Sequence, residues 1–232
     1  TTAAATTTTA AATTTTVAAT TTTTTTAAAS GIVSITSASA TLTAGTPDTL
    51  ILDSFTAGGT LFTTATDLSL GTSVNTGGTP GSTDDINWQD DFDFNLYFGR
   101  GANAALDETW TVSLFGGVNW YNTNGDDADF FVFEAGGNDS ISVRPIFVGG
   151  GVGQYTVLST KGGIVNYGDT GVTITEGART GNNMFGLAFA ITDLKDGAGD
   201  PLTNSSVIEG LDFDGFGSDI GNISAVAVPL AS

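Results

Sequence analysis

The chain has 232 residues, of which 24 are acidic and 5 are basic, so its formal net charge is −19. This charge excludes nucleic acid and anionic membrane surfaces as partners, because both are bound by clustered lysine and arginine. The chain has no cysteine and no histidine, which removes disulfides, thiolate chemistry, the usual zinc ligands and the commonest general base. Such acidity favours solubility and divalent cations instead.

Residues 1–29 contain only threonine, alanine and Val17. These side chains bury too little apolar area to offset chain entropy, so the segment cannot build a core of its own. It is also too rich in hydroxyls for a membrane span, which needs about 20 mostly apolar residues. We therefore expect an extended, low-complexity segment that is organised by another chain, by covalent decoration, or by both.

Residues 30–232 have the pattern of a single all-β domain. Short apolar or alternating runs are separated by Gly-Gly, Asn-Gly and Asp-Gly signals, and no run keeps a helical period. Residues 72–85 are rich in Gly, Thr, Ser and Pro and are expected to form a loop. The fold expected is a jelly-roll-like β-sandwich. The expected strands cover residues 31–40, 50–52, 61–62, 92–98, 110–115, 130–134, 140–148, 154–158, 171–175, 185–191, 207–213 and 223–228.

Four acidic clusters stand in Gly-rich or Asn-rich sequence, at residues 84–93, 124–129, 193–200 and 212–219. Calcium takes six to eight oxygen ligands, and short Asp/Asn/Gly loops deliver them because glycine permits tight curvature. The alternative is that aspartate populates turns for backbone reasons, which needs no ion. The candidate calcium ligands are Asp212, Asp214 and Asp219 in one cluster and Asp196 and Asp200 in another.

Catalysis is not indicated. The chain has four glutamates, Glu108, Glu134, Glu176 and Glu209, and no motif pairs two of them as glycoside hydrolysis requires. Glu134 follows an apolar strand and could point into a cleft, but no base, nucleophile or oxyanion site is evident. Four aromatic residues form either a sugar-stacking platform or part of the core: Trp88, Trp110, Trp120 and Tyr121.

Two kinds of glycosylation site are predicted. Three Asn-X-Ser triplets begin at Asn138, Asn204 and Asn222. The threonine-rich segment resembles a mucin-like stalk and is the stronger candidate for hydroxyl-linked sugars. Its first two threonine runs are Thr6, Thr7, Thr8, Thr9, Thr13, Thr14, Thr15 and Thr16, and a third covers residues 20–26.

The C-terminal residues 218–229 end in Ala225-Val226-Ala227-Val228-Pro229. This stretch resembles the final strand of bacterial exosortase-sorted (PEP-CTERM-like) surface proteins, in which that strand leads into an Ala-Val-Pro-Glu-Pro signal. Residues 129–139 also look like a stretch common in that β-sandwich class. The Glu-Pro, the membrane helix and the basic tail are missing here. The resemblance implies an extracytoplasmic, often glycosylated, matrix or surface protein.

These observations predict a structural subunit of an extracellular helical filament, with copies of itself as partners and no membrane insertion of the mature chain. A β-sandwich edge accepts a strand from a neighbour, and a head-to-tail contact that does not close grows into a fibre. The donated strand is either residues 1–29, which we favour, or residues 31–40. The expected assembly residues are Val17, Ile32, Val33 and Ile35.

Two other functions remain open. One is a secreted carbohydrate-binding module on a glycosylated Thr-rich linker, which requires an aromatic platform with a calcium ion nearby. The other, less favoured, is an acidic glycan-active enzyme. The alternatives differ in the expected size of the protein under native conditions, because only the filament requires it to be a polymer.

Overall fold

The computed structural model describes residues 31–45, 48–64, 68–70, 72–75, 109–113, 119–123, 125, 128–160, 167–176, 180–214 and 220–226. Within these ranges the protein is all-β, as the sequence predicts, with one 3₁₀ turn, η2 (Ile191–Asp193). Every ladder between named strands is antiparallel. The strands are β1 (Val33–Thr43), β2 (Thr49–Ala57), β3 (Thr60–Thr63), β4 (Leu68–Leu70), β5 (Thr72–Asn75), β6 (Thr109–Ser113), β7 (Trp120–Tyr121), β8 (Phe130–Ala135), β9 (Ile141–Ile146), β10 (Thr156–Ser159), β11 (Gly168–Thr173), β12 (Asn183–Phe189), β13 (Val207–Ile208), β14 (Gly210–Asp214) and β15 (Ile220–Val226).

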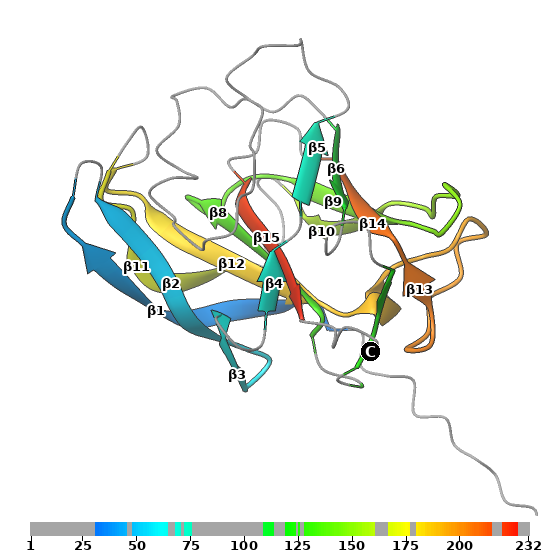
Figure 1. Ribbon diagram of the computed structural model, residues 1–232, viewed down its shortest axis with the longest axis horizontal. Helices are drawn as coiled ribbons and strands as arrows, with labels where there is room; N and C mark the ends of the chain where they lie inside the picture. Colours follow the sequence, from blue (N-terminus) through cyan, green and yellow to red (C-terminus); the bar gives the residue numbers. More distant parts are fainter. Residues whose placement is uncertain are drawn as a thin grey trace, which may run out of the picture.

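The larger sheet has the order β3-β2-β1-β12-β8-β15-β4, and β11 also pairs with β12. The smaller sheet has the order β10-β9-β14-β6-β5, and β13 pairs with β7 in a separate two-stranded ladder. Figure 1 shows β1 and β2 on the left and β5, β6 and β14 of the smaller sheet on the right, with β8 and β15 between them. The arrangement is sandwich-like.

Strand β8 is buried on both faces, because its sequence FFVFEA is a continuous apolar run interrupted only by Glu134. Phe130 and Val132 point into a cluster shared with the smaller sheet. Phe131 and Phe133, on the opposite face, pack into a second cluster with residues of β2 and β3. The two hydrophobic clusters therefore lie on either side of one central strand.

Strand β1 leaves β12 at Ile35 and stays in the larger sheet through its ladder with β2. Its first residues pair with β12, where Ile35 lies opposite Gly186, and β11 takes over the same edge of β12 with Gly168 opposite that glycine. A Cβ at Gly168 would lie 2.3 Å from the Ile35 carbonyl oxygen, so only glycine permits this approach. Beyond this point β1 pairs with β2 alone among the described strands.

Some predicted boundaries are wrong. The expected loop at residues 72–85 begins with a strand, because Thr72–Asn75 pair with β6 as β5. The expected strand at residues 207–213 is two strands in different sheets, which separate at Glu209. Strands β4 and β7 were not predicted, since runs of two or three residues carry no measurable period. The expected strand at residues 92–98 lies outside the described residues.

Candidate functional site

The start of β1 belongs to the chain's own core. Ile35 is completely buried among side chains of β2, β8 and β12. Ile32 packs against the cluster shared by the two sheets, and Val33 packs against the same cluster as Ile35. Val17, the fourth expected assembly residue, lies outside the described residues. Donation of residues 31–40 to a neighbour would require these contacts to be broken, which favours residues 1–29 as the donor.

Asp193 fixes the point at which the chain enters the β-domain. Its carboxylate accepts a hydrogen bond from the backbone N–H of Ala190 at 2.9 Å and another from that of Gly31. Burial raises the pKa of this carboxyl, and the two backbone hydrogen bonds oppose the shift. Gly31 is therefore held against η2, directly after the Thr/Ala segment.

Strand β1 has different neighbours on its two sides. Residues 37–43 form a ladder with β2 on one side. On the other side β12 pairs with residues 33–35, and β11 then lies beside β1 without forming a ladder with it. Exposed side chains line this run, among them Ser37, Ser39 and Thr41.

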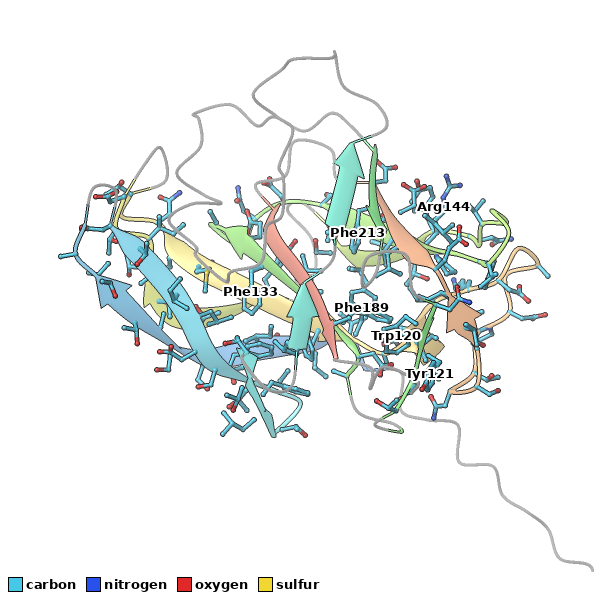
Figure 2. All side chains as sticks on the ribbon, in the orientation of Figure 1. Trp120, Tyr121, Phe133, Arg144, Phe189 and Phe213 are labelled. Atoms are coloured by element: carbon cyan, nitrogen blue, oxygen red, sulfur yellow. The ribbon has the colours of Figure 1, made fainter. Side chains whose placement is uncertain are left out.

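The smaller sheet carries an ion pair with an aromatic partner. Its arginine, Arg144, is labelled in Figure 2. Asp212 Oδ2 accepts from Arg144 Nε at 2.7 Å and lies 2.6 Å from Nη2 of the same guanidinium. The Tyr155 hydroxyl donates to the same oxygen at 3.1 Å, and the guanidinium carbon lies 4.5 Å from the centre of its ring. Burial, reinforced by the nearby Asp212 carboxylate, raises the pKa of Tyr155 to about 12.

This ion pair bears on the expected calcium ligands of the 212–219 cluster. Asp212 uses one carboxylate oxygen for Arg144 and Tyr155, and Asp214 lies exposed at the end of the same strand. Asp219 lies outside the described residues. Calcium binding by this cluster therefore stays a prediction.

The second expected calcium cluster forms a turn. Asp196 Oδ1 accepts from the backbone N–H of Ala198 at 2.8 Å and of Asp200 at 3.0 Å, which is the aspartate turn that the sequence left as an alternative. In the described part of the chain, no three His, Cys, Asp or Glu side chains are grouped to hold a metal ion. The geometry of this loop favours the turn interpretation for Asp196.

The three Asn-X-Ser triplets occupy different surroundings. Asn138 is exposed in the turn between β8 and β9, and Asn204 is exposed in a turn at residues 203–206. Asn222 instead lies within β15, opposite Phe133 of β8. A transferase needs an accessible acceptor loop, so the folded domain favours Asn204 and Asn138 over Asn222.

We therefore expect carbohydrate on Asn204 and on several threonines of residues 1–29, the latter outside the described residues. Intact mass spectrometry of the natively purified protein checks this directly, against 23.3 kDa for the polypeptide. Asn204→Gln should lower the measured mass by that of one glycan. Asn222→Gln should leave the excess of the measured mass over the polypeptide mass unchanged. A protomer with the mass of its polypeptide alone would contradict the prediction.

The expected aromatic platform is not assembled around Trp120. This side chain is completely buried, with its ring 4.7 Å from that of Phe130, so it belongs to the core. Tyr121, the next residue, is 41% exposed (Figure 2). Trp110 lies in β6, and Trp88 lies outside the described residues. Of the four aromatics, Tyr121 alone is shown to be exposed.

Glu134 is also inside the protein, not in a cleft. It is completely buried, and one carboxylate oxygen accepts from the backbone N–H of Gly137. The Tyr167 ring lies nearby, and burial, followed by the charge of Glu134, raises the pKa of its hydroxyl. Because a solvent-borne substrate cannot reach this carboxylate, Glu134 does not supply a catalytic acid in this fold.

Comparison of the chain with protein-family models, curated proteins and solved structures found no match. The resemblance to exosortase-sorted surface proteins therefore stays a prediction. Among the described residues, no helix is both long and apolar enough to span a membrane.

Proposed function

We propose that this protein is a structural subunit of an extracellular helical filament, in which residues 1–29 of one copy add as a strand to the β-domain of the next. The observation that carries the proposal is the distribution of charge along the chain. Residues 1–47 contain no Asp, Glu, Lys or Arg, so all charges lie in residues 48–232. This uncharged run includes β1, whose first residues are anchored in the domain's own core.

The charge distribution favours contact through the N-terminal run. Copies that each carry a net charge of −19 repel one another, and salt screens this repulsion only beyond about 8 to 10 Å. An uncharged segment approaches a neighbouring domain without that cost. Threonine suits an added strand because it is β-branched, and main-chain hydrogen bonds supply the affinity.

The finer parts of the proposal have separate support. A jelly-roll topology is suggested by the mixing of early and late strands in both sheets, such as β1 with β12 and β6 with β14. Secretion is favoured by the Thr/Gly/Ser-rich composition, the few basic residues and the exosortase-like C-terminal strand. Glycans on the Thr/Ala segment would shield it from proteases. We propose a structural role and no catalytic one.

The test is deletion of residues 1–29. We expect the truncated chain to fold and to remain monomeric, because the connecting strand is lost while the described core is retained. Electron microscopy and light scattering of the purified protein measure the loss of polymer, and thermal unfolding measures the integrity of the domain.

The matched control is deletion of residues 227–232, which removes another uncharged terminal stretch. This variant should still polymerise. Fibres of normal width from the chain without residues 1–29 would exclude that segment as the connector. A full-length chain that stays monomeric and binds glycans would favour the carbohydrate-binding alternative.

A further inference from the structure

The Asn-X-Ser triplet at Asn204 lies close in sequence to one strand of a ladder with an exposed apolar pair. Tyr121 of β7 and Val207 of β13 stand directly opposite each other in that two-stranded ladder. Tyr121 is 41% exposed and Val207 is 42% exposed, whereas the adjacent Trp120 and Ile208 are completely buried. The ladder therefore packs one face into the core and presents an aromatic and a β-branched side chain on the other. We call Tyr121 and Val207 the outer pair.

Hydrogen bonds tie Asn204 to the end of β7. Asn122, the residue after this strand, donates from Nδ2 to Asn204 Oδ1 at 3.2 Å. The same nitrogen donates to the Gly125 carbonyl at 2.6 Å, and Asn122 Oδ1 accepts from the Gly125 N–H at 3.1 Å. The Asn122 side chain is thus fixed by its own turn. Consecutive Cα atoms are about 3.8 Å apart, so Tyr121 is a near neighbour of the contact between the two asparagines.

The turn that carries Asn204 also leads to Val207. The Thr203 N–H donates to Ser206 Oγ at 3.0 Å, and the Ser206 N–H donates to the Thr203 carbonyl at 2.9 Å. This closed turn holds Asn204, which is exposed, just before the start of β13. Asn204 is therefore connected to both members of the outer pair, through Asn122 on one side and through its own turn on the other.

The outer pair offers a surface that suits a sugar ring. A pyranose carries C–H groups on its faces, and packing them on an aromatic ring removes apolar surface of both partners from water. Tyrosine fits this contact because its ring is apolar while its hydroxyl can stay in water. A ladder of two short strands is marginally stable by itself, so a sugar packed over it adds to the stability that Trp120 and Ile208 supply from the core side.

We propose that carbohydrate attached to Asn204 folds back onto the outer pair, with its first pyranose ring packed against Tyr121 and Val207. Attachment joins Asn204 Nδ2 to the anomeric carbon of a glycosyl phosphate donor. The nitrogen–carbon bond forms, the bond from that carbon to the phosphate oxygen breaks, the phosphate leaves with the electron pair, and the amide loses one proton. The hydrogen bond from Asn122 uses Oδ1 and is compatible with attachment at Nδ2. This assignment rests on the glycosylation that accompanies the filament proposed above, and not on the assembly contact.

The first experiment is a double-mutant cycle in melting temperature on the natively glycosylated protein, with Asn204→Gln, Tyr121→Ser and the double variant. Asn204→Gln should lower the melting temperature by about 2–4 °C, the shift for one contact of aromatic-pair strength in a domain of this size. In the Tyr121→Ser background the same substitution should cost less than half as much, because the sugar has lost its platform. Leu61→Ser on β3, at a side chain that is 65% exposed, is the matched control, and its effect should add to that of Asn204→Gln.

The same variants from a host that attaches no carbohydrate separate the sugar from the asparagine. In that material Asn204→Gln removes only the hydrogen bond from Asn122, so its effect should be the same with and without Tyr121→Ser. The coupling between positions 121 and 204 should therefore be present in the glycosylated protein and absent from the unglycosylated one.

The second experiment measures the cover over Tyr121 directly. Tetranitromethane nitrates accessible tyrosine rings, and peptide mapping reports each tyrosine separately. Nitration of Tyr121 should be severalfold slower in the glycosylated protein than in the unglycosylated one. Tyr155 is the internal control, because its hydroxyl donates to Asp212 beside the smaller sheet, and its nitration rate should be the same in both materials.

The outcomes separate this assignment from the filament. Additive effects of Asn204→Gln and Tyr121→Ser in the glycosylated protein, or equal nitration of Tyr121 in both materials, would overturn the packed sugar and leave the filament standing. Natively purified protein without carbohydrate on Asn204 would overturn it as well. A chain that shows the coupling and the protection of Tyr121 but never polymerises would support this assignment and overturn the proposed function.

Discussion

Phe131→Ala is expected to destabilise the domain by about 3–5 kcal/mol, the range for truncating a fully buried aromatic residue. Phe131 is completely buried, and its ring lies 4.8 Å from that of Phe55 and 4.6 Å from that of Phe62. These contacts join β8 to the β2–β3 hairpin. Since domains are stable by only about 5–15 kcal/mol, the loss should be evident as a large fall in denaturant midpoint with little change in the m-value.

Two comparisons make this prediction specific. Phe131→Leu keeps most of the buried area and should cost less than half as much as the alanine substitution. Leu61→Ala removes a side chain that is 65% exposed, and should shift stability by no more than about 0.5 kcal/mol. If Phe131→Ala and Leu61→Ala have similar effects, β8 does not separate two packed clusters.

The sequence predicts strand β8, but it does not predict that Glu134 is buried. Four consecutive apolar residues, beginning at Phe130, indicate a strand that is buried on both faces. In the sequence Glu134 stands at the end of that run, where a charged side chain is ordinarily expected to be exposed to solvent. The structure continues the strand to Ala135 and encloses the carboxylate. Its surroundings, including Tyr167, come from segments distant in sequence and leave no local signal.

The break between β13 and β14 at Glu209 shows a second limit of predicting strands from the local sequence pattern. Residues 207–213 alternate well enough to look like one strand, but the chain changes sheets at this residue. Its backbone N–H donates to the Ile146 carbonyl at 2.9 Å, a contact between positions far apart in the chain. Val207 therefore pairs in the two-stranded ladder, and Gly210 starts a strand of the smaller sheet.

The sequence predicts which types of residue the candidate site contains, but it does not predict how they are arranged in space. The uncharged N-terminal run is visible in the sequence, but the packing of β12 and β11 beside β1 is not. Likewise, Asp212 was identified only as a member of an acidic cluster. Its partners Arg144 and Tyr155 lie 68 and 57 residues away and meet it through the register of β9 with β14 and the position of Tyr155 before β10.

Arg144→Met is expected to destabilise the domain by about 2 kcal/mol, below the roughly 3–5 kcal/mol for breaking a fully buried pair, because the arginine is partly exposed. The Asp212 side chain is 9% exposed and that of Arg144 is 30% exposed. Methionine keeps much of the apolar stem but removes the guanidinium, so the Asp212 carboxylate loses its cationic partner and keeps the hydrogen bond from the Tyr155 hydroxyl. Denaturant unfolding of the variant and the wild type measures the difference.

The double variant Arg144→Met/Asp212→Leu is the decisive control. Replacing both charges with apolar groups removes the stranded carboxylate, so stability should recover to within about 1 kcal/mol of wild type. Because the pair is largely shielded from solvent, the cost of Arg144→Met should also persist in high salt, where exposed pairs are screened. If Arg144→Met unfolds at the wild-type denaturant midpoint, the ion pair adds nothing to stability.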